Sequence, residues 1–323
     1  MNPPVFTPAW WLPGPHAQTL GARLLRPKRG PSSRRARWTT PDGDFLDLDF
    51  VEGANLRDDV RVLLLHGLEG SSSSGYILEL ERRLFDRGIG TVALNFRSCS
   101  GEPNRGHRLY HSGETTDLAW VIDRLRGSKP ERRLAAVGVS LGGNVLLKNL
   151  GETGASTPFT AAAAWSVPFD LGAGARFMER GFSQRYVGRL LRSLKSKVTA
   201  REHELGGSID LERALRASTF REFDDAATAP LHGFDDADDY YRRSSSAGFI
   251  PKIATPTLIL HARDDPFLPA DAIPETAMRD NPAITPVITD HGGHVGFVSG
   301  RVPLLPHFWA EDLLVGWLAE RII

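Results

Sequence analysis

The chain has 323 residues, of which 41% are hydrophobic and 24% are charged, a composition that excludes a disordered tail, a collagen-like fibre and a disulfide-stabilised miniprotein. Its 39 basic and 39 acidic residues give a net charge of zero, so no overall charge favours binding to nucleic acid. One cysteine, no apolar run of membrane-spanning length and no signal peptide predict a cytoplasmic globular protein without a transmembrane segment.

Residues 1–36 are predicted to form an arm that packs on the body of the protein. Several prolines in its first half argue against a long helix there. Trp10 and Trp11 are expected to be covered, because indole rings are costly to leave in water. The arm should lead into an antiparallel hairpin, since residues 36–40 and 45–50 flank the turn sequence Pro41-Asp42-Gly43.

Beyond the hairpin, short apolar runs alternate with helical patterns. The expected buried strands are residues 60–65, 91–95, 134–137, 161–167, 257–261 and 284–289. The expected helices between and after them are residues 76–86, 115–125, 141–150 and 309–318. This order predicts an α/β fold with a mostly parallel sheet, antiparallel strands at its start and helices on both faces.

The alternation stops over residues 169–252, which are predicted to form a helical cap inserted into an α/β core of residues 37–168 and 253–323. Apolar side chains recur there every four residues from Phe182 to Val198, as on one face of an amphipathic helix. The other face of that helix is basic. Two interpretations of the basic face stay open, a solvated surface or a contact with anionic lipid.

The strongest chemical signal is Gly138-Val139-Ser140-Leu141-Gly142, which lies between an apolar strand and an apolar helix. A sharp strand-to-helix turn exposes the serine hydroxyl, and small flanking glycines let the backbone pass close by. Ser140 is therefore the candidate nucleophile. The backbone N–H groups of Leu141 and of Leu68, in His66-Gly67-Leu68-Glu69-Gly70, are the candidate oxyanion donors.

The acid and the base of such a site are expected in the loops after the last two strands. Asp265 is the candidate acid because Pro266 follows it, with Asp264 as the competing residue. His294 is the candidate base because Gly292 and Gly293 leave it room, and His291 is the alternative. The spacing of His291 and His294 also suits a metal pair, but it lacks a helix and a third ligand, so neither a metal nor a cofactor is expected.

The order Ser140, Asp265, His294 is that of the α/β-hydrolases. Nearly the whole chain resembles one branch of that superfamily, the YheT-like esterases. The matching strings are residues 11–12, 14–19, 66–71, 95–105, 110–113, 221–225, 264–267 and 291–297. The resemblance implies the same triad that the residues indicate. It implies the reaction class more firmly than the substrate.

A serine hydrolase that cleaves carboxylic esters is the predicted function, with a small-molecule ester, an acyl lipid included, as substrate. The alternatives are a lipase, phospholipase or thioesterase, and a hydrolase scaffold that only binds. Residues 96–113 follow a strand and carry Arg97, His107, Arg108, Tyr110 and His111, which either bind a polar head group or hold the loop in place. Neither the oligomeric state nor the acyl chain length follows from the sequence.

Overall fold

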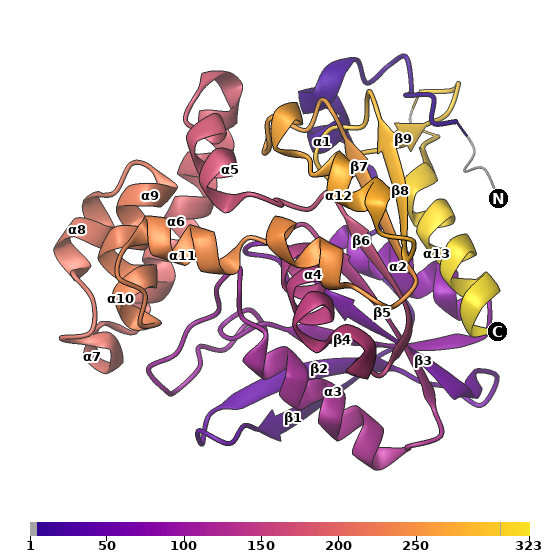
Figure 1. Ribbon diagram of the computed structural model, residues 1–323, viewed down its shortest axis with the longest axis horizontal. Coiled ribbons are helices and arrows are strands. Elements are labelled where there is room, and N and C mark those ends of the chain that lie inside the picture. Colours follow the sequence, from indigo (N-terminus) through magenta and orange to yellow (C-terminus); the bar gives the residue numbers. More distant parts are fainter. Residues whose placement is uncertain (1–4, 304) are drawn as a thin grey trace.

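The computed structural model describes residues 5–303 and 305–323, and its centre is one eight-stranded sheet (Figure 1). The strand order is β1-β2-β4-β3-β5-β6-β7-β8. Strand β2 pairs antiparallel with β1 and with β4, and all other pairs of this sheet are parallel. The strands are β1 (Arg34–Thr39), β2 (Phe45–Val51), β3 (Arg57–Leu65), β4 (Ile89–Asn95), β5 (Arg133–Val139), β6 (Phe159–Trp165), β7 (Thr257–Ala262) and β8 (Ile284–Thr289). The predicted mostly parallel α/β fold is confirmed.

Helices cover both faces of the sheet because its strands are apolar on both sides. In β3, Leu63 and Leu65 face one apolar core, and Val60, Val62 and Leu64 face the other. The first core also receives α3, α4 and α12, and the second receives α2 and α13. These helices are α2 (Gly75–Phe85), α3 (Thr116–Ser128), α4 (Leu141–Thr153), α12 (Glu275–Asp280) and α13 (Trp309–Ile322). A further two-stranded ribbon joins β9 (Val298–Ser299) to β10 (His307–Phe308).

The N-terminal arm differs from the prediction in two respects. It contains a 12-residue helix, α1 (Gly14–Leu25), although prolines argued against one. Pro15 lies in the first turn of α1, where a missing N–H group costs no intrahelical hydrogen bond. Trp10 is 71% exposed, although its indole N–H donates a hydrogen bond to the Arg301 carbonyl at 2.9 Å. Trp11 is half-buried.

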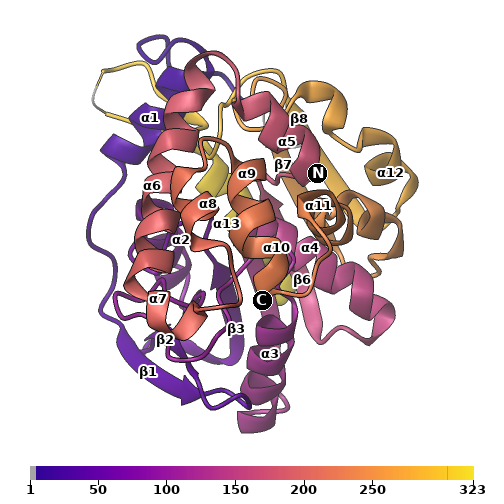
Figure 2. The same ribbon diagram turned by 90° about the vertical axis from the view of Figure 1, so that its left-hand side faces the viewer.

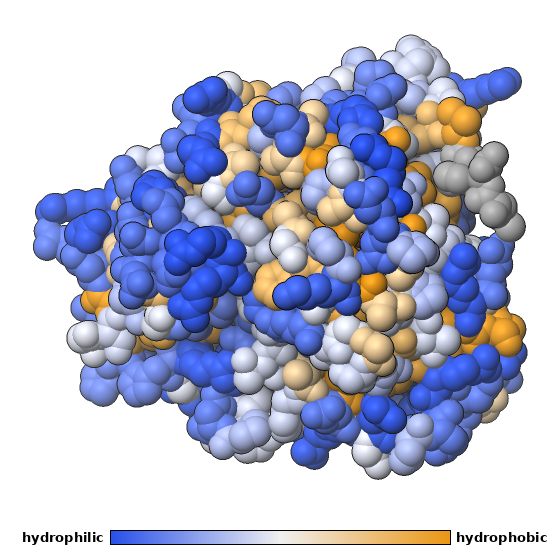
Figure 3. All heavy atoms as spheres, viewed as in Figure 1, coloured by the Kyte–Doolittle hydropathy of each residue, from blue (hydrophilic) through white to orange (hydrophobic). Residues whose placement is uncertain are grey.

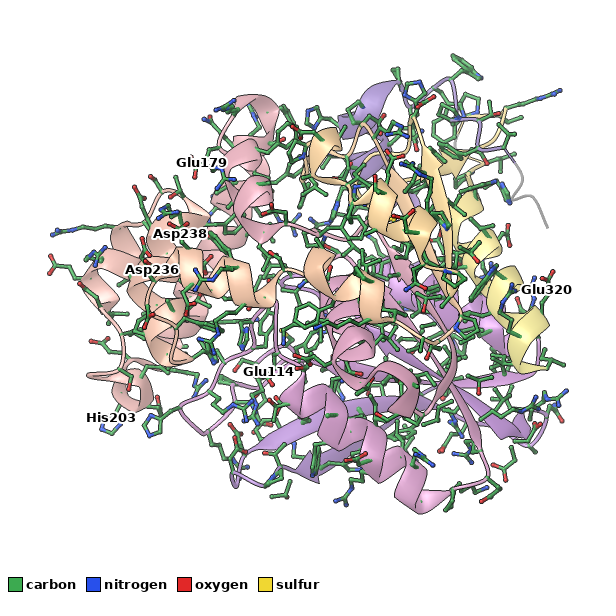
Figure 4. The ribbon with its side chains drawn as sticks, viewed as in Figure 1. Glu114, Glu179, His203, Asp236, Asp238 and Glu320 are labelled. Carbon is green, nitrogen blue, oxygen red and sulfur yellow. The ribbon has the colours of Figure 1, made fainter. Side chains whose placement is uncertain are left out.

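The chain between β6 and β7 is helical, and Figure 2 shows these helices standing in front of the sheet. They are α5 (Leu171–Met178), α6 (Gln184–Ala200), α7 (Glu202–Leu205), α8 (Leu211–Arg216), α9 (Phe220–Phe223), α10 (Ala229–Leu231) and α11 (Ala237–Ser244). Their outer surface is mostly hydrophilic in the view of Figure 3. Asp236, Asp238 and His203 are exposed on that surface (Figure 4). Among the described residues, no helix is both long and apolar enough to cross a membrane.

Candidate active site

Ser140 lies at the turn between β5 and α4, where the sequence predicts a nucleophile. Its backbone has φ +54° and ψ −121°, a conformation that a residue with a side chain rarely adopts. Its N–H donates to the Trp165 carbonyl at 2.8 Å, and its own carbonyl accepts the Asn144 N–H at 3.0 Å. These bonds hold the strained turn in place. Helix α4 begins directly after it, so its first N–H groups, that of Leu141 included, have no acceptor within the helix.

The turn is tight enough to require glycine at two positions. A Cβ atom on Gly138 would lie 2.4 Å from the Gly142 carbonyl oxygen. A Cβ on Gly142 would lie 2.5 Å from the carbonyl oxygens of Leu65 and His66, at the end of the neighbouring strand β3. These contacts are with backbone atoms, which cannot move aside as a flexible side chain would.

Gly142→Ala is therefore expected to lower the free energy of unfolding by about 3 kcal/mol or more. Gly188→Ala is the matched control, because Gly188 lies in helix α6 with open space around its Cα. Alanine there should raise stability by up to about 1 kcal/mol, since it has the higher helix propensity. Denaturant unfolding of both variants measures the difference. Equal stabilities would contradict the steric argument.

The structure brings the three predicted side chains into one hydrogen-bonded chain. Ser140 Oγ lies 2.9 Å from His294 Nε2. His294 Nδ1 lies 2.8 Å from Asp265 Oδ2 and 3.1 Å from Oδ1. The ionised carboxylate can only accept, so the Nδ1 atom carries the proton and Nε2 is left to accept from the serine hydroxyl. Asp265 is 2% exposed and His294 8%, so the chain is largely shielded from water.

The two competing residues form a separate pair. His291 Nδ1 lies 3.4 Å from Asp264 Oδ2, and the His291 side chain is 65% exposed. The Asp264 side chain is only 17% exposed, and its Oδ1 accepts the Gly293 N–H at 2.8 Å. Burial raises the pKa of this carboxyl. Asp264 thus holds the backbone of the loop that carries His294.

Sequence reasoning missed three residues that hold His294. The Phe267 ring stacks on the imidazole, with centroids 3.9 Å apart and planes 3° from parallel. Thr19 Oγ1, on α1, accepts the His294 N–H at 2.9 Å. Ser166 Oγ accepts the N–H of the next residue, Val295, at 3.0 Å. Thr19 and Phe267 fall within the strings that carry the family resemblance, which was the available signal for both.

The loop that carries Leu68 is tied to helix α6 through Glu69. Glu69 has φ +54°, and its N–H donates to Tyr110 Oη at 2.8 Å. Its carboxylate accepts from Tyr110 Oη and from Lys197 Nζ, each at 2.7 Å, and from Ser193 Oγ. Sequence reasoning did not assign Glu69 a role. These bonds restrain the backbone beside the Leu68 N–H from two directions.

His66, in the same loop, is a structural residue. It is fully buried, its Nε2 accepts the Phe96 N–H at 3.1 Å, and its Nδ1 donates to the Gly67 carbonyl at 2.8 Å. Burial lowers its pKa to about 4, so the ring is neutral at neutral pH.

The loop of residues 96–113 is held at its start by ion pairs with residues outside the loop. The Arg97 side chain is fully buried and bonds Asp117 at 2.6 Å, Asp42 at 3.0 Å and Asp44 at 3.2 Å. A head group therefore has no access to Arg97. His111 differs, because it lines a cavity beside Ser140.

Among the described residues, one group of three has ligand atoms close enough for a metal ion. The atoms of His111, Glu114 and His232 lie within 4.8 Å of one another. Glu114, labelled in Figure 4, already accepts the Thr116 N–H at 2.9 Å on Oε1 and bonds Arg108 at 2.8 Å through Oε2. Because the carboxylate is committed to the start of α3 and to a guanidinium, we assign no metal to this group.

Two cavities meet at Ser140 and His294. The first has a volume of about 120 Å³ and is lined mainly by apolar side chains. Many of them belong to the helical segment between β6 and β7, among them Leu171, Ala175, Met178, Leu190, Leu194 and Phe220. The second has a volume of about 420 Å³ and is lined largely by α1, the Leu68 loop, the start of α2 and the face of α6. Leu68 lines both cavities and Leu141 the first. An ester carbonyl at Ser140 therefore has space on both of its sides.

Comparison with known proteins shows the family to which the chain belongs. The model of the alpha/beta hydrolase fold family matches residues 60–300. YheT of Escherichia coli strain K12, named as a proposed esterase, is 41% identical over 310 residues, which are 95% of this chain and 91% of YheT. Phospholipase ABHD3 of Mus musculus is 33% identical over 305 residues, which are 92% of this chain and 74% of that protein.

Among solved structures, the Pyrococcus furiosus esterase Pf2001 matches with a TM-score of 0.59 at 17% sequence identity, and the match covers all of both chains. At that identity the likeness shows the fold alone. The sequence matches go further, because they extend over nearly the whole chain at higher identity. The protein therefore belongs to the α/β-hydrolase fold family, and within it to the group of esterase-like proteins that includes YheT.

Proposed function

We propose that the protein is a serine hydrolase that cleaves carboxylic esters through an acyl-enzyme intermediate. The observation that carries the proposal is the hydrogen-bonded chain from Ser140 Oγ through His294 to Asp265, beside a cavity. The three residues follow β5, β7 and β8, so the carboxyl edge of the sheet sets their spacing. Hydrolase-family membership supports the reaction class.

In the proposed reaction, His294 Nε2 takes the proton of Ser140 as Oγ attacks the ester carbonyl carbon. The N–H groups of Leu68 and Leu141 donate to the oxyanion that forms. His294 then gives its proton to the leaving alcohol oxygen as the ester C–O bond breaks, which leaves an acyl group on Ser140. Water, activated by the same imidazole, releases the acid. Asp265 keeps the Nδ1 proton in place and stabilises the imidazolium.

The first cavity favours an acyl lipid as a second, narrower candidate. Its wall is mainly hydrocarbon, as at Met178, Leu190 and Leu194, and it adjoins Ser140. The similarity to the relative named Phospholipase ABHD3 also supports an acyl lipid as the substrate. A thioester would use the same groups, so an ester and a thioester of one acyl chain should be compared directly.

A fluorophosphonate probe tests the proposal against a binding scaffold. We expect covalent labelling of the protein, mapped by mass spectrometry to Ser140, together with turnover of nitrophenyl esters. A scaffold without an activated serine would give neither. Labelling at another serine would overturn the assignment of Ser140.

The helical segment is proposed to act as a cap that limits acyl length. Ala175 lies on α5, is 7% exposed and lines the first cavity. Ala175→Phe should fill part of that space and lower kcat/KM for a dodecanoyl ester by about tenfold or more, with little effect on a butanoyl ester. Rates over a panel of nitrophenyl esters of rising chain length measure this shift.

Ala173→Phe is the matched control, because Ala173 lies on the same helix outside the cavity wall. It should leave the chain-length profile unchanged. If Ala175→Phe lowered the rates of long and short esters equally, the segment would not set acyl length.

A further inference from the structure

The two cavities at Ser140 differ in the charge of their walls. The first contains the carboxyl of Asp224 and no lysine or arginine among its lining residues. Burial raises the pKa of Asp224 to about 6, and its Oδ2 accepts from Tyr241 at 2.8 Å. The second cavity is lined by three arginines, Arg23, Arg26 and Arg189, and by one carboxylate, Glu69. The two sides of a bound ester therefore meet different electrostatic surroundings.

Some of the charges in the second cavity are neutralised within the protein. Arg26 is buried and bonds Glu311 at 2.6 Å, in addition to the Val295 carbonyl at 2.7 Å. Glu69 bonds Lys197 at 2.7 Å. Neither of these pairs leaves a net charge for a ligand to meet.

Arg23 and Arg189 remain without such partners. Arg23 lies on α1 and Arg189 on α6, and both are exposed where they line the cavity. Within residues 5–303 and 305–323, no carboxylate lies at ion-pair distance from either guanidinium. The cavity wall thus carries two unneutralised positive charges from different elements.

The start of helix α2 adds to this field. Ser73, Ser74 and Gly75 line the same cavity, and α2 begins at Gly75. The N-terminus of a helix presents free N–H groups and the positive end of its dipole. Two arginines and a helix N-terminus on the wall of one cavity favour an anion there.

We propose that the second cavity binds the alcohol part of the ester, and that Arg23 and Arg189 select alcohols that carry an anionic group such as a phosphate. This inference rests on the proposed ester hydrolysis. The apolar first cavity takes the acyl chain, so the alcohol extends into the second cavity. His294 lines both cavities, which lets it reach the leaving oxygen. Guanidinium groups bind phosphate through paired N–H donors.

Three esters with eight-carbon acyl groups test the proposal in the wild-type protein. Two of them have the octanoyl chain itself, one on glycerol, which is neutral, and one on glycerol 3-phosphate. The third is the glycerol monoester of octanedioic acid, whose alcohol part is neutral and whose free carboxylate lies at the end of the acyl chain. The phosphate ester is expected to have the highest kcat/KM. Its advantage should shrink between about 0.05 M and about 0.5 M salt, because salt screens exposed charges.

Arg189→Gln and Arg23→Gln should each lower kcat/KM for the phosphate ester by roughly tenfold, mainly through KM, and should leave the neutral glycerol ester unchanged. Arg192→Gln is the matched control, because Arg192 is exposed on the same helix and does not line either cavity. It should change neither rate.

The outcomes separate this inference from the proposed function. If neutral esters are cleaved but the phosphate gives no advantage, or both arginine variants leave the phosphate ester unaffected, the anion site is wrong while ester hydrolysis stands. The anion site would also be wrong if the two arginine variants lowered kcat/KM for the octanedioic ester as much as for the phosphate ester. If no ester is cleaved, calorimetric binding of the phosphate and glycerol esters to the Ser140→Ala protein still decides the question, and equal affinities would overturn the inference.

Discussion

Ser140→Ala is expected to lower kcat for ester hydrolysis by about 10³-fold or more. The hydroxyl is the only group of that side chain that can attack the ester, and its proton acceptor, His294 Nε2, stands 2.9 Å away. The turn itself should persist, because its backbone bonds to Trp165 and Asn144 do not involve the hydroxyl. Activity should therefore fall without a matching loss of stability, as measured by turnover and thermal unfolding of the same samples.

Ser208→Ala provides the control, because Ser208 is exposed in the helical segment and lines neither cavity. It should retain full activity and full fluorophosphonate labelling. Wild-type turnover by the Ser140→Ala protein would mean that another group attacks the ester. A protein that unfolds at a much lower temperature would instead point to a structural role for the hydroxyl.

The sheet could be predicted because its strands are unusually apolar. Strands such as β3 and β5 are buried on both faces, so their sequences contain short, mostly apolar runs. The candidate site followed from that prediction, since residues after the strands gather at one edge of the sheet. Ser140, Asp265 and His294 are far apart in the chain but each follows a strand.

The parts that could not be predicted depend on contacts between distant segments. Thr19 and His294 are 275 residues apart, and nothing in the pattern around Thr19 indicates that its hydroxyl accepts an N–H from the last loop. Likewise, Glu69 looks like one more loop residue until Lys197, 128 residues later, is found beside it. The number of prolines in the arm does not predict helix α1, because the position of a proline decides its effect, and Pro15 in the first turn is compatible with a helix.

Asp265→Asn is expected to lower kcat by roughly 10⁴-fold, and far more than Asp264→Asn. Both oxygens of Asp265 lie near His294 Nδ1, and Oδ1 also accepts the Phe267 N–H at 2.8 Å. If the asparagine oxygen keeps the Phe267 bond, its amide N–H₂ faces Nδ1 and favours the tautomer with the proton on Nε2. That tautomer cannot accept the proton of Ser140.

Asp264→Asn has a different expected effect because Asp264 binds backbone. An asparagine oxygen can still accept the Gly293 N–H that Asp264 Oδ1 accepts at 2.8 Å, so the loop should keep its place and kcat should fall by about tenfold at most. The pH dependence of kcat separates the two roles. Only Asp265→Asn removes the charge that stabilises the imidazolium, which makes His294 a weaker base, so only that variant should reach its residual maximum at a lower pH. A larger loss in Asp264→Asn, or the same shift of the profile in both variants, would place the orienting carboxylate at Asp264, with His291 as the imidazole it faces.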